Sequence, residues 1–275
     1  MKSANLILFT DLDGTLLDHD TYSYCAAKEA LNLVREACLP LIFCSSKTRA
    51  EIEVWRERLG NNDPFICENG GAVFFSDALN PPSQKHIEKN GYQVIELGIP
   101  HADILKRFNT LKNKFGDRIK GFSELDVEEL MDWTGLPYGD VMLAKEREYT
   151  EPFIFDGNET DKKELGETIR DLNLNLTRGG RFHCLMGNND KGKAVNIIAT
   201  LYKEDRPGLI TVALGDSYND LPMLKVVDIP ILVQKPGGLY ENEIDLPNLH
   251  RAPGVGPIGW NKALLTILSG RGKTY

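Results

Sequence analysis

The chain has 275 residues and a formal net charge of −8, which suits one large domain or two unequal ones with enough apolar content for a real core. The acidic balance argues against a sequence-independent nucleic-acid binder, which needs a basic face, although a local cation cluster or a bound metal could still hold a small anion. The five scattered cysteines form no C-x-x-C pair, and no apolar run matches a signal peptide or the ~18 residues of a membrane span, so we expect a cytoplasmic protein with reduced thiols and no membrane contact.

Strand and helix signals alternate along the first third of the chain. Residues 6–9 are a short apolar run typical of a buried strand, and apolar residues then recur at helical spacing. The expected elements are a strand over 6–9, a helix over 27–38, a strand over 41–44, a helix from about 47 to 59, and a strand–turn–strand unit over 64–75. Strands that alternate with helices at this interval indicate a parallel, doubly wound sheet.

The middle of the chain has a different pattern. Asn80-Pro81-Pro82-Ser83 is typical of a linker, and beyond it charged helical stretches mix with isolated strand-like pieces up to Leu185. The alternating pattern then resumes with a helix over 193–202, strands over 209–214 and 229–233, and a helix over 260–268. We therefore predict an α/β core with a doubly wound, mostly parallel sheet in residues 1–81 and 187–275, and an inserted α+β cap domain in residues 82–186.

Two aspartates follow directly after the first predicted strand. Asp11 and Asp13 stand at i and i+2 in Phe9-Thr10-Asp11-Leu12-Asp13-Gly14-Thr15, so both side chains project to the same side. The carboxyl ends of the strands bind ligands in a doubly wound sheet, and two close carboxylates need a cation or a shared proton. Mg²⁺ beside a carboxylate nucleophile and an acid–base partner meets that need, whereas the alternative is a simple Asp-Gly turn.

A second acidic segment follows a later strand, in Leu214-Gly215-Asp216-Ser217-Tyr218-Asn219-Asp220. A capping box would explain Ser217 and Asp220, but it gives Asp216 no role. If the segment turns helical, Asp216 and Asp220 point the same way, one turn apart, and can complete a site for a hard cation. We expect both acidic segments to lie at one edge of the sheet.

Cationic and hydroxyl side chains stand at two other turns. Lys191, in Asn188-Asn189-Asp190-Lys191-Gly192-Lys193, precedes a helix, where a lysine is unfavourable unless an anion such as phosphate lies nearby. A lysine that extends into solvent is equally compatible with the sequence. Ser45, in Cys44-Ser45-Ser46-Lys47-Thr48-Arg49, ends the second strand, where a hydroxyl and free backbone N–H groups form an anion pocket. Ordinary N-capping by Ser45 or Ser46 is compatible with that role.

Together the four motifs resemble the haloacid dehalogenase (HAD) superfamily. Their order, D-x-D-G-T, serine, lysine and G-D-x-x-x-D, agrees with that family across the whole core, and the large insert is similar to that of its branch with a C2-type cap. The resemblance implies a Mg²⁺-dependent phosphatase in which Asp11 attacks phosphorus, while Asp13 protonates the leaving oxygen and then activates water. It further implies that Ser45 and Lys191 bind the phosphoryl group. The implied metal site comprises Asp11, the backbone carbonyl of Asp13, Asp216, and Asp220, which would hold the metal's waters or Lys191.

A narrower resemblance is to mannosyl-3-phosphoglycerate phosphatases. It depends on four stretches of sequence: residues 18–24 (DHDTYSY), 44–51 (CSSKTRAE), 68–71 (ENGG) and 179–183 (GGRFH). That family forms the compatible solute mannosylglycerate from a substrate that carries a carboxylate and a sugar besides its phosphate. The substrate contacts implied by this resemblance are Ser46, Lys47, Asn69, Gly70, Arg178 and Arg181, with the arginines placed to pair with the carboxylate. The alternatives are a surface salt bridge for Arg181 and a simple hairpin turn for Asn69-Gly70.

Other functions stay open at this point. The substrate could instead be glucosyl-3-phosphoglycerate or another sugar phosphate, and the fold could serve a phosphomutase or a non-catalytic phosphate-binding regulatory module. The retained Asp13 favours catalysis, because a module without turnover needs no second acid. We expect the cap to close over a small phosphorylated sugar acid about hinges at Pro81-Pro82 and Met186-Gly187. No nucleic-acid or membrane partner is expected, and the sequence predicts no oligomeric state.

Overall fold

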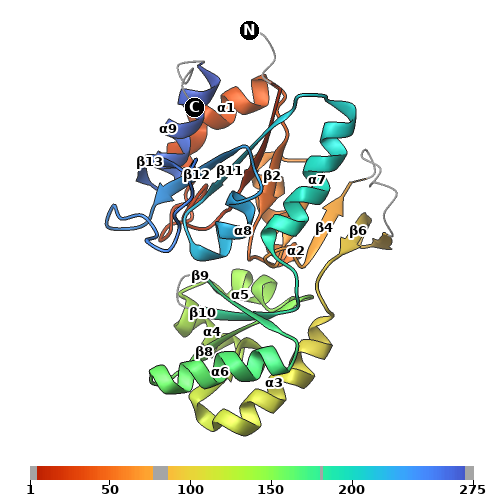
Figure 1. Ribbon diagram of the computed structural model, residues 1–275, viewed down its shortest axis with the longest axis vertical. Coiled ribbons are helices and arrows are strands. Elements are labelled where there is room, and N and C mark those ends of the chain that lie inside the picture. Colours follow the sequence, from red (N-terminus) through yellow and green to blue (C-terminus); the bar gives the residue numbers. More distant parts are fainter. Residues whose placement is uncertain (1–4, 77–85, 180–181, 270–275) are drawn as a thin grey trace.

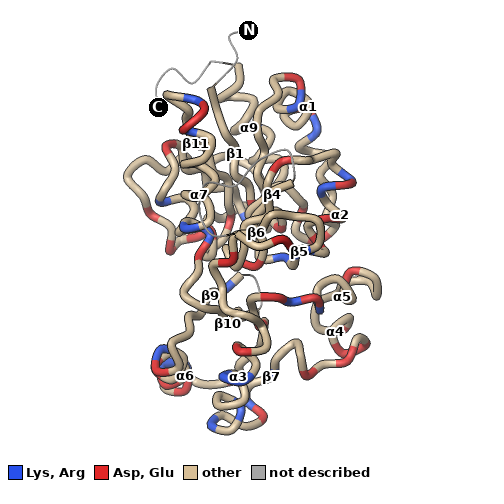
Figure 2. The backbone as a smooth tube through the Cα atoms, turned by 90° about the vertical axis from the view of Figure 1, so that its right-hand side faces the viewer, with Lys and Arg blue, Asp and Glu red and all other residues tan. Residues whose placement is uncertain are grey.

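The computed structural model describes residues 5–76, 86–179 and 182–269, which form two parts, each built on its own sheet (Figure 1). The larger part, the core, holds a nine-stranded sheet with the order β13-β12-β11-β1-β2-β3-β4-β6-β5. The smaller part, the cap, holds a four-stranded sheet with the order β7-β8-β10-β9. Figure 2 shows the two parts, one above the other, in a second view. The predicted class, an α/β core with a mostly parallel sheet and an inserted cap, is confirmed.

The core sheet is parallel from β13 to β3 and antiparallel from β3 to β5. Its strands are β1 (Leu6–Thr10), β2 (Leu41–Cys44), β3 (Phe65–Cys67), β4 (Ala72–Phe75), β5 (Ile87–Lys89), β6 (Tyr92–Glu96), β11 (Ile210–Gly215), β12 (Ile229–Gln234) and β13 (His250–Val255). Its helices are η1 (Cys25–Ala27), α1 (Lys28–Glu36), α2 (Arg49–Leu59), α7 (Lys191–Asp205), η4 (Tyr218–Asp220), α8 (Leu221–Leu224) and α9 (Pro257–Leu268).

Strand β1 shows why the central strands are largely apolar. Leu6 and Leu8 point into the cluster that packs against α1, α2 and α9, whereas Ile7 and Phe9 point into the cluster that packs against α7 and α8. Since helices cover both faces, the strand alternates between two apolar layers and every one of its residues is buried. Charged side chains such as that of Asp11 therefore follow the carboxyl end of β1, where the chain leaves the two apolar layers.

The cap sheet is antiparallel throughout and has helices packed against it. Its strands are β7 (Ile119–Gly121), β8 (Thr150–Phe155), β9 (Asn175–Gly179) and β10 (Phe182–Met186). Its helices are α3 (His101–Phe115), η2 (Gly116–Arg118), η3 (Phe122–Glu124), α4 (Val127–Thr134), α5 (Tyr138–Ala144) and α6 (Glu159–Asp171). None of the helices in the described residues is long and apolar enough to cross a membrane.

The border between core and cap differs from the predicted one at its first crossing. The expected start at residue 82 and the expected hinge at Pro81-Pro82 lie outside the described residues. Strands β5 and β6 follow that point, yet they extend the core sheet through β4, so the part with its own sheet begins at α3. The second crossing follows β10, which ends at Met186.

Candidate active site

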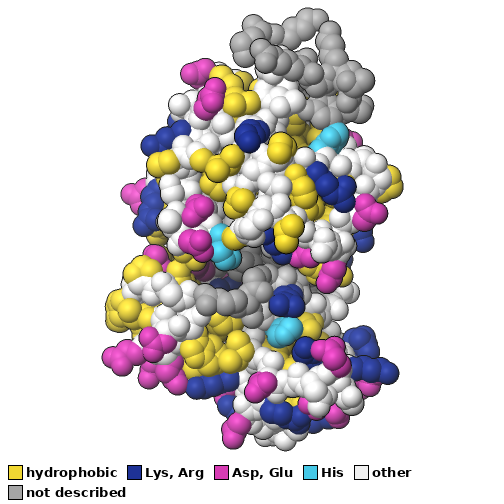
Figure 3. All heavy atoms as spheres, turned by 90° about the vertical axis from the view of Figure 1, so that its left-hand side faces the viewer, with side chains coloured by type: hydrophobic (Ala, Val, Ile, Leu, Met, Phe, Trp, Pro, Cys, Tyr) yellow, Lys and Arg dark blue, Asp and Glu magenta, His cyan; other side chains and the backbone are white. Residues whose placement is uncertain are grey.

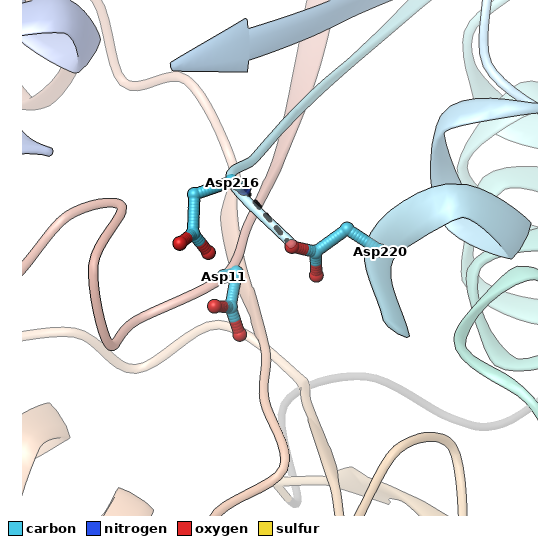
Figure 4. A group of neighbouring side chains, drawn as sticks. All are labelled: Asp11, Asp216 and Asp220. Atoms are coloured by element: carbon cyan, nitrogen blue, oxygen red, sulfur yellow. Dashed lines mark hydrogen bonds between the residues drawn. The ribbon is translucent and has the colours of Figure 1, made fainter. Parts of the chain in front are cut away.

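Asp11 and Asp216 leave the core sheet side by side. Strands β1 and β11 are parallel neighbours with Thr10 opposite Leu214, and the N–H of Asp11 donates to the carbonyl of Leu214 at 3.0 Å. Both aspartates therefore leave their strands at the same edge. Figure 4 shows the carboxylates of Asp11, Asp216 and Asp220 converging on one point.

Lys191, the first residue of α7, joins two of these carboxylates. Its Nζ donates to Asp11 Oδ1 at 2.7 Å and to Asp220 Oδ1 at 2.6 Å, and its side chain is fully buried. Burial by itself lowers the pKa of Lys191, but the negative charges of Asp11 and Asp220 outweigh it and raise that pKa. The lysine is thus a permanent cation beside Asp11, and the alternative of a solvated side chain does not hold.

Asp216 and Asp220 are fixed by the turn that joins β11 to α8. Asp220 Oδ2 accepts the N–H groups of Asp216 and Ser217 at 3.0 Å each. Asp216 in turn accepts Ser217 Oγ at 2.9 Å and Thr15 Oγ1 at 3.4 Å. Burial, followed by the charge of Asp220, raises the pKa of Asp216 to about 7. Burial also raises the pKa of Asp11 well above its usual value, although Lys191 opposes that shift.

The residues present fit a divalent cation. Among the described residues, Asp11, Asp216 and Asp220 each offer one carboxylate oxygen within 4.8 Å of the others. Three buried carboxylates against one lysine leave an excess of negative charge, and oxygen donors of this kind suit Mg²⁺. The preceding loop also fits closely, since a Cβ at Gly14 (φ +72°) would lie 2.8 Å from Asp216 Oδ2.

The carboxylate of Asp13 has a different partner. Its Oδ2 lies 3.0 Å from Lys47 Nζ, and its Oδ1 has no hydrogen-bond partner within the part of the chain that the structure describes. Lys47 also contacts Glu51 Oε1 at 3.3 Å and lies over the ring of Tyr22. Burial lowers the pKa of Lys47, but Asp13 and Glu51 raise it by more, so this side chain too stays charged.

Ser45 and Ser46, the two serines that follow β2, have different surroundings. Ser45 is fully buried at the end of β2, where its Oγ accepts the N–H of Lys47 at 3.2 Å. Ser46 lies on the wall of the cavity between core and cap. The N-cap of α2 is neither serine but Thr48, which forms a capping box with Glu51.

The predicted turn at Asn69-Gly70 joins β3 and β4 as expected. Asn69 lies on the cavity wall and its side chain accepts Asn219 Nδ2 at 3.1 Å. Gly70 has φ +85°, and a Cβ there would collide with the carbonyl of Asp190, just before Lys191. Gly70 therefore lets this turn approach the start of α7, and it is not part of the cavity lining.

One of the two predicted cap arginines, Arg178, lies among the described residues. Arg178 is exposed on β9 and is not part of the cavity lining, and Arg181 lies outside the described residues. The arginine that does line the cavity is Arg147, which follows α5 and which no sequence motif indicated. Glu51 also lines the cavity, and no sequence motif indicated this, because its spacing from Thr48 points only to a capping box.

The cavity measures about 610 Å³ and lies between the carboxyl edge of the core sheet and the cap. Asp11, Asp13 and Asp216 form its core side, while Phe122, Leu136 and Phe182 belong to its cap side. On the outer face drawn in Figure 3, Lys/Arg and Asp/Glu side chains are interspersed over both parts. The cavity lining holds more carboxylates than cations, so a small anionic ligand needs a bound cation there.

The chain is similar to a family of hydrolases and to several named phosphatases. A family model described as haloacid dehalogenase-like hydrolase matches residues 8–235. The chain is 48% identical over 263 residues to the glucosyl-3-phosphoglycerate/mannosyl-3-phosphoglycerate phosphatase of Methanococcoides burtonii, with 95% of this chain and 97% of that protein covered. It is 41% identical to the protein of the same name from Persephonella marina, with 96% and 97% covered. It is 39% identical to the mannosyl-3-phosphoglycerate phosphatase of Pyrococcus horikoshii, with 82% and 90% covered.

Solved structures share the whole architecture. A phosphatase of the haloalkanoate (HAD) enzyme superfamily from Bacteroides thetaiotaomicron superposes with a TM-score of 0.67 at 18% identity, with 98% of this chain and 96% of that chain covered. The sucrose-phosphatase of Synechocystis superposes with a TM-score of 0.61 at 13% identity, with 97% and 98% covered. At these identities the likeness shows a common fold.

Proposed function

Because the chain belongs to the haloacid dehalogenase-like hydrolases, we propose that it is a Mg²⁺-dependent phosphatase that converts mannosyl-3-phosphoglycerate to mannosylglycerate and phosphate. The observation that carries the proposal is the buried cluster in which Lys191 joins Asp11 to Asp220 beside Asp216. The substrate is supported by three relatives that are 39–48% identical and carry mannosyl-3-phosphoglycerate in their names.

The first chemical step is the transfer of the phosphoryl group to Asp11. The carboxylate of Asp11 attacks phosphorus, so that a P–O bond to Asp11 forms while the P–O bond to the glycerate breaks. Asp13 gives its proton to the departing glycerate oxygen. Lys191, held 2.7 Å from Asp11, offsets the charge of the phosphoryl oxygens, and the hydroxyl of Ser45 is assigned to the same group.

The second step returns the enzyme to its starting state. Asp13, now a carboxylate, takes a proton from a water molecule that attacks phosphorus, the bond to Asp11 breaks, and phosphate leaves. Mg²⁺ would be held by Asp11, the backbone carbonyl of Asp13 and Asp216, with Asp220 holding the metal's waters or Lys191, and when bound it would supply positive charge against the phosphoryl oxygens. Substrate contacts are assigned to Ser46, Lys47 and Asn69 on the cavity wall.

Glucosyl-3-phosphoglycerate is a second candidate substrate. Two of the relatives, at 48% and 41% identity, carry both glycosyl phosphoglycerates in their names. The two sugars differ in the configuration of one hydroxyl group, and the phosphate and glycerate contacts are the same for both. A small metabolite of this class agrees with a cavity of about 610 Å³.

The direct test is phosphate release from purified protein. We expect release from mannosyl-3-phosphoglycerate and glucosyl-3-phosphoglycerate with Mg²⁺, and none after chelation with EDTA. A panel that includes mannose 6-phosphate, glucose 6-phosphate and sucrose 6-phosphate tests the substrate. Equal kcat/KM across the panel would remove the glycosyl phosphoglycerate assignment, whereas activity without any divalent cation would remove the metal.

A further inference from the structure

Two cations of the cavity wall share one carboxylate. Lys47 and Arg147 both approach Glu51, at 3.3 Å from Oε1 and 3.7 Å from Oε2 respectively. Glu51 is itself held in place, because its Oε2 accepts the N–H of Thr48 at 2.9 Å. Lys47, Glu51 and Arg147, called here the Lys47–Arg147 cluster, all line the cavity.

Arg147 is held rigidly, and one end of it is left for a ligand. Its Nη1 donates to the carbonyl of Ser46 in the core at 2.8 Å, and its Nε donates to the carbonyl of Ala144 in the cap at 2.9 Å. Among the described residues Nη2 makes no hydrogen bond, since Glu51 is beyond hydrogen-bond reach. A fixed guanidinium with a free donor edge suits a carboxylate.

The carboxylates of Asp13 and Glu51 offset the two cations of the Lys47–Arg147 cluster, but neither forms a hydrogen bond with Arg147. Glu51 faces both cations, while Glu68, whose charge also reaches Arg147, is occupied by the N–H groups of Glu148 and Tyr149 and by Thr150 Oγ1. Lys47 completes its contacts with Asp13. No carboxylate among the described residues forms a hydrogen bond with Arg147, and an anion from the substrate can do so.

The reaction places the substrate's acid group at this cluster. If Asp13 protonates the leaving oxygen, that oxygen lies next to Asp13, and Lys47 Nζ is 3.0 Å from the Asp13 carboxylate. In a 3-phosphoglycerate the carboxylate carbon is three bonds from the ester oxygen, a reach of about 4 Å. Lys235 is the other lysine of the cavity lining. It forms an ion pair with Glu241, and its charge lowers the pKa of Asp216, so it is not assigned to the substrate's carboxylate.

We propose that Lys47 and Arg147 bind the carboxylate of the substrate's leaving group, so that the cavity selects phosphoesters whose alcohol part carries an acid. This inference rests on the proposed function and assigns the carboxylate to Arg147 in place of Arg178 and Arg181. Arg147 belongs to the cap and donates a hydrogen bond to the carbonyl of Ser46 in the core. The cap therefore contributes directly to the selection of substrates that carry an acid group.

The test compares two substrates that differ only in the acid group. One is mannosyl-3-phosphoglycerate, and the other is the analogue in which CH₂OH replaces the carboxylate. Wild-type protein should prefer the acid by about 10- to 100-fold in kcat/KM, the range of a charge-assisted hydrogen-bond pair. Arg147→Met should remove most of that preference, with about a tenfold or larger loss on the acid and less than about a threefold loss on the analogue.

Arg107 supplies the matched control. It is also a cap arginine whose guanidinium donates to two backbone carbonyls, those of Leu172 and Asn173, but it does not line the cavity. Arg107→Met should leave the preference unchanged. Equal losses on both substrates in Arg147→Met would show that Arg147 only clamps cap to core and would overturn the inference. Wild-type protein that releases no phosphate from the acid would instead overturn the proposed function, and the inference with it.

A measurement on wild-type protein covers the case in which Arg147→Met does not fold. Mannosylglycerate, the product, should inhibit at least about tenfold more strongly than its carboxamide, because the amide cannot pair with two cations. Arg147→Lys, which keeps a charge but not the planar donor edge, should lower this ratio. Equal inhibition by acid and amide in wild-type protein contradicts a carboxylate site.

Discussion

The core edge and the cap wall face each other across one cavity, but they hold their polar groups in different ways. At the core edge, short turns directly after β1 and β11 place Asp11 and Asp216, and Lys191 fixes Asp11 with a bond of 2.7 Å. The cap wall is largely aromatic and aliphatic, with Phe122, Leu136 and Phe182, and Arg147 is its arginine. The core edge thus presents charged side chains to the cavity. The cap wall presents mostly apolar side chains, together with the guanidinium of Arg147.

This difference separates chemistry from selectivity. Groups that act on phosphorus need fixed positions and a low-dielectric setting, which a buried sheet edge provides. Groups that choose the substrate can differ between relatives without disturbing that edge. Changes at the core edge should therefore abolish turnover, while changes in the cap should shift preference or stability.

The largest effect is expected at Asp11. Asp11→Asn should lower kcat by more than about 10³-fold, because an amide is a poor nucleophile toward phosphorus. Circular dichroism and gel filtration should show an unchanged fold. Asp18→Asn, a change of an aspartate on the loop after β1 that does not line the cavity, serves as the control. Substantial turnover by Asp11→Asn would place the chemistry elsewhere.

Mg²⁺ should stabilise the protein through the core edge alone. Metal at 100 times its Kd adds about 2.7 kcal/mol to the free energy of unfolding, which for a chain of this size raises Tm by roughly 5–10 °C. Asp216→Asn should lose most of this shift, because it removes one of the three carboxylates. Thermal melts with Mg²⁺ and with EDTA measure it. An equal shift in wild type and variant would mean that the ion binds outside the cluster.

Glu68 tests the join between core and cap. Its buried carboxylate in the β3–β4 turn accepts the N–H groups of Glu148 and Tyr149 and the hydroxyl of Thr150, all in the cap segment. Glu68→Gln sets an amide N–H₂ against one of these donors and should cost about 1–3 kcal/mol in the free energy of unfolding. Urea unfolding compares it with Glu88→Gln, an exposed position on β5 that should change nothing.

The pH dependence of stability should depend on Asp216. Its pKa in the folded, metal-free protein is about 7, above that of an unfolded aspartate, so the folded state favours the protonated form. Stability from this group is present below about pH 4 and is lost as the pH rises to about 7. In EDTA, Asp216→Asn should therefore raise Tm over wild type more at pH 8 than at pH 5. A difference that is the same at both pH values contradicts the shift.

The smallest effect is expected at Arg178. Its side chain is exposed on β9 and outside the cavity lining, so Arg178→Ala should change kcat/KM for mannosyl-3-phosphoglycerate by less than about twofold. Measuring kcat/KM of Arg147→Met under the same conditions shows which of the two arginines binds the substrate's carboxylate. A tenfold or larger loss at Arg178 would return the carboxylate contact to the arginines expected from the sequence.

The sequence predicted the core better than the cap for a physical reason. Each core motif is local: Asp11 and Asp216 each follow an apolar strand, and parallel strands bring their carboxyl ends to one edge. Arg147 stands in the charged run of residues 145–148 (KERE), which shows neither helical nor strand periodicity. It reaches the cavity only through the packing of α5 against α2. The border at residue 82 came too early for a related reason, since β5 is three residues long and largely exposed, and such a strand leaves no apolar signal.

The central claim is that phosphate leaves the substrate by way of Asp11, and trapping the intermediate tests it most directly. Protein mixed with excess mannosyl-3-phosphoglycerate and Mg²⁺ is quenched in acid within one turnover, digested and analysed by mass spectrometry. We predict a phosphoryl group on the peptide that contains Asp11, and none when Mg²⁺ is withheld or in Asp11→Asn. A peptide that stays unmodified while phosphate is released at the full rate would contradict the account.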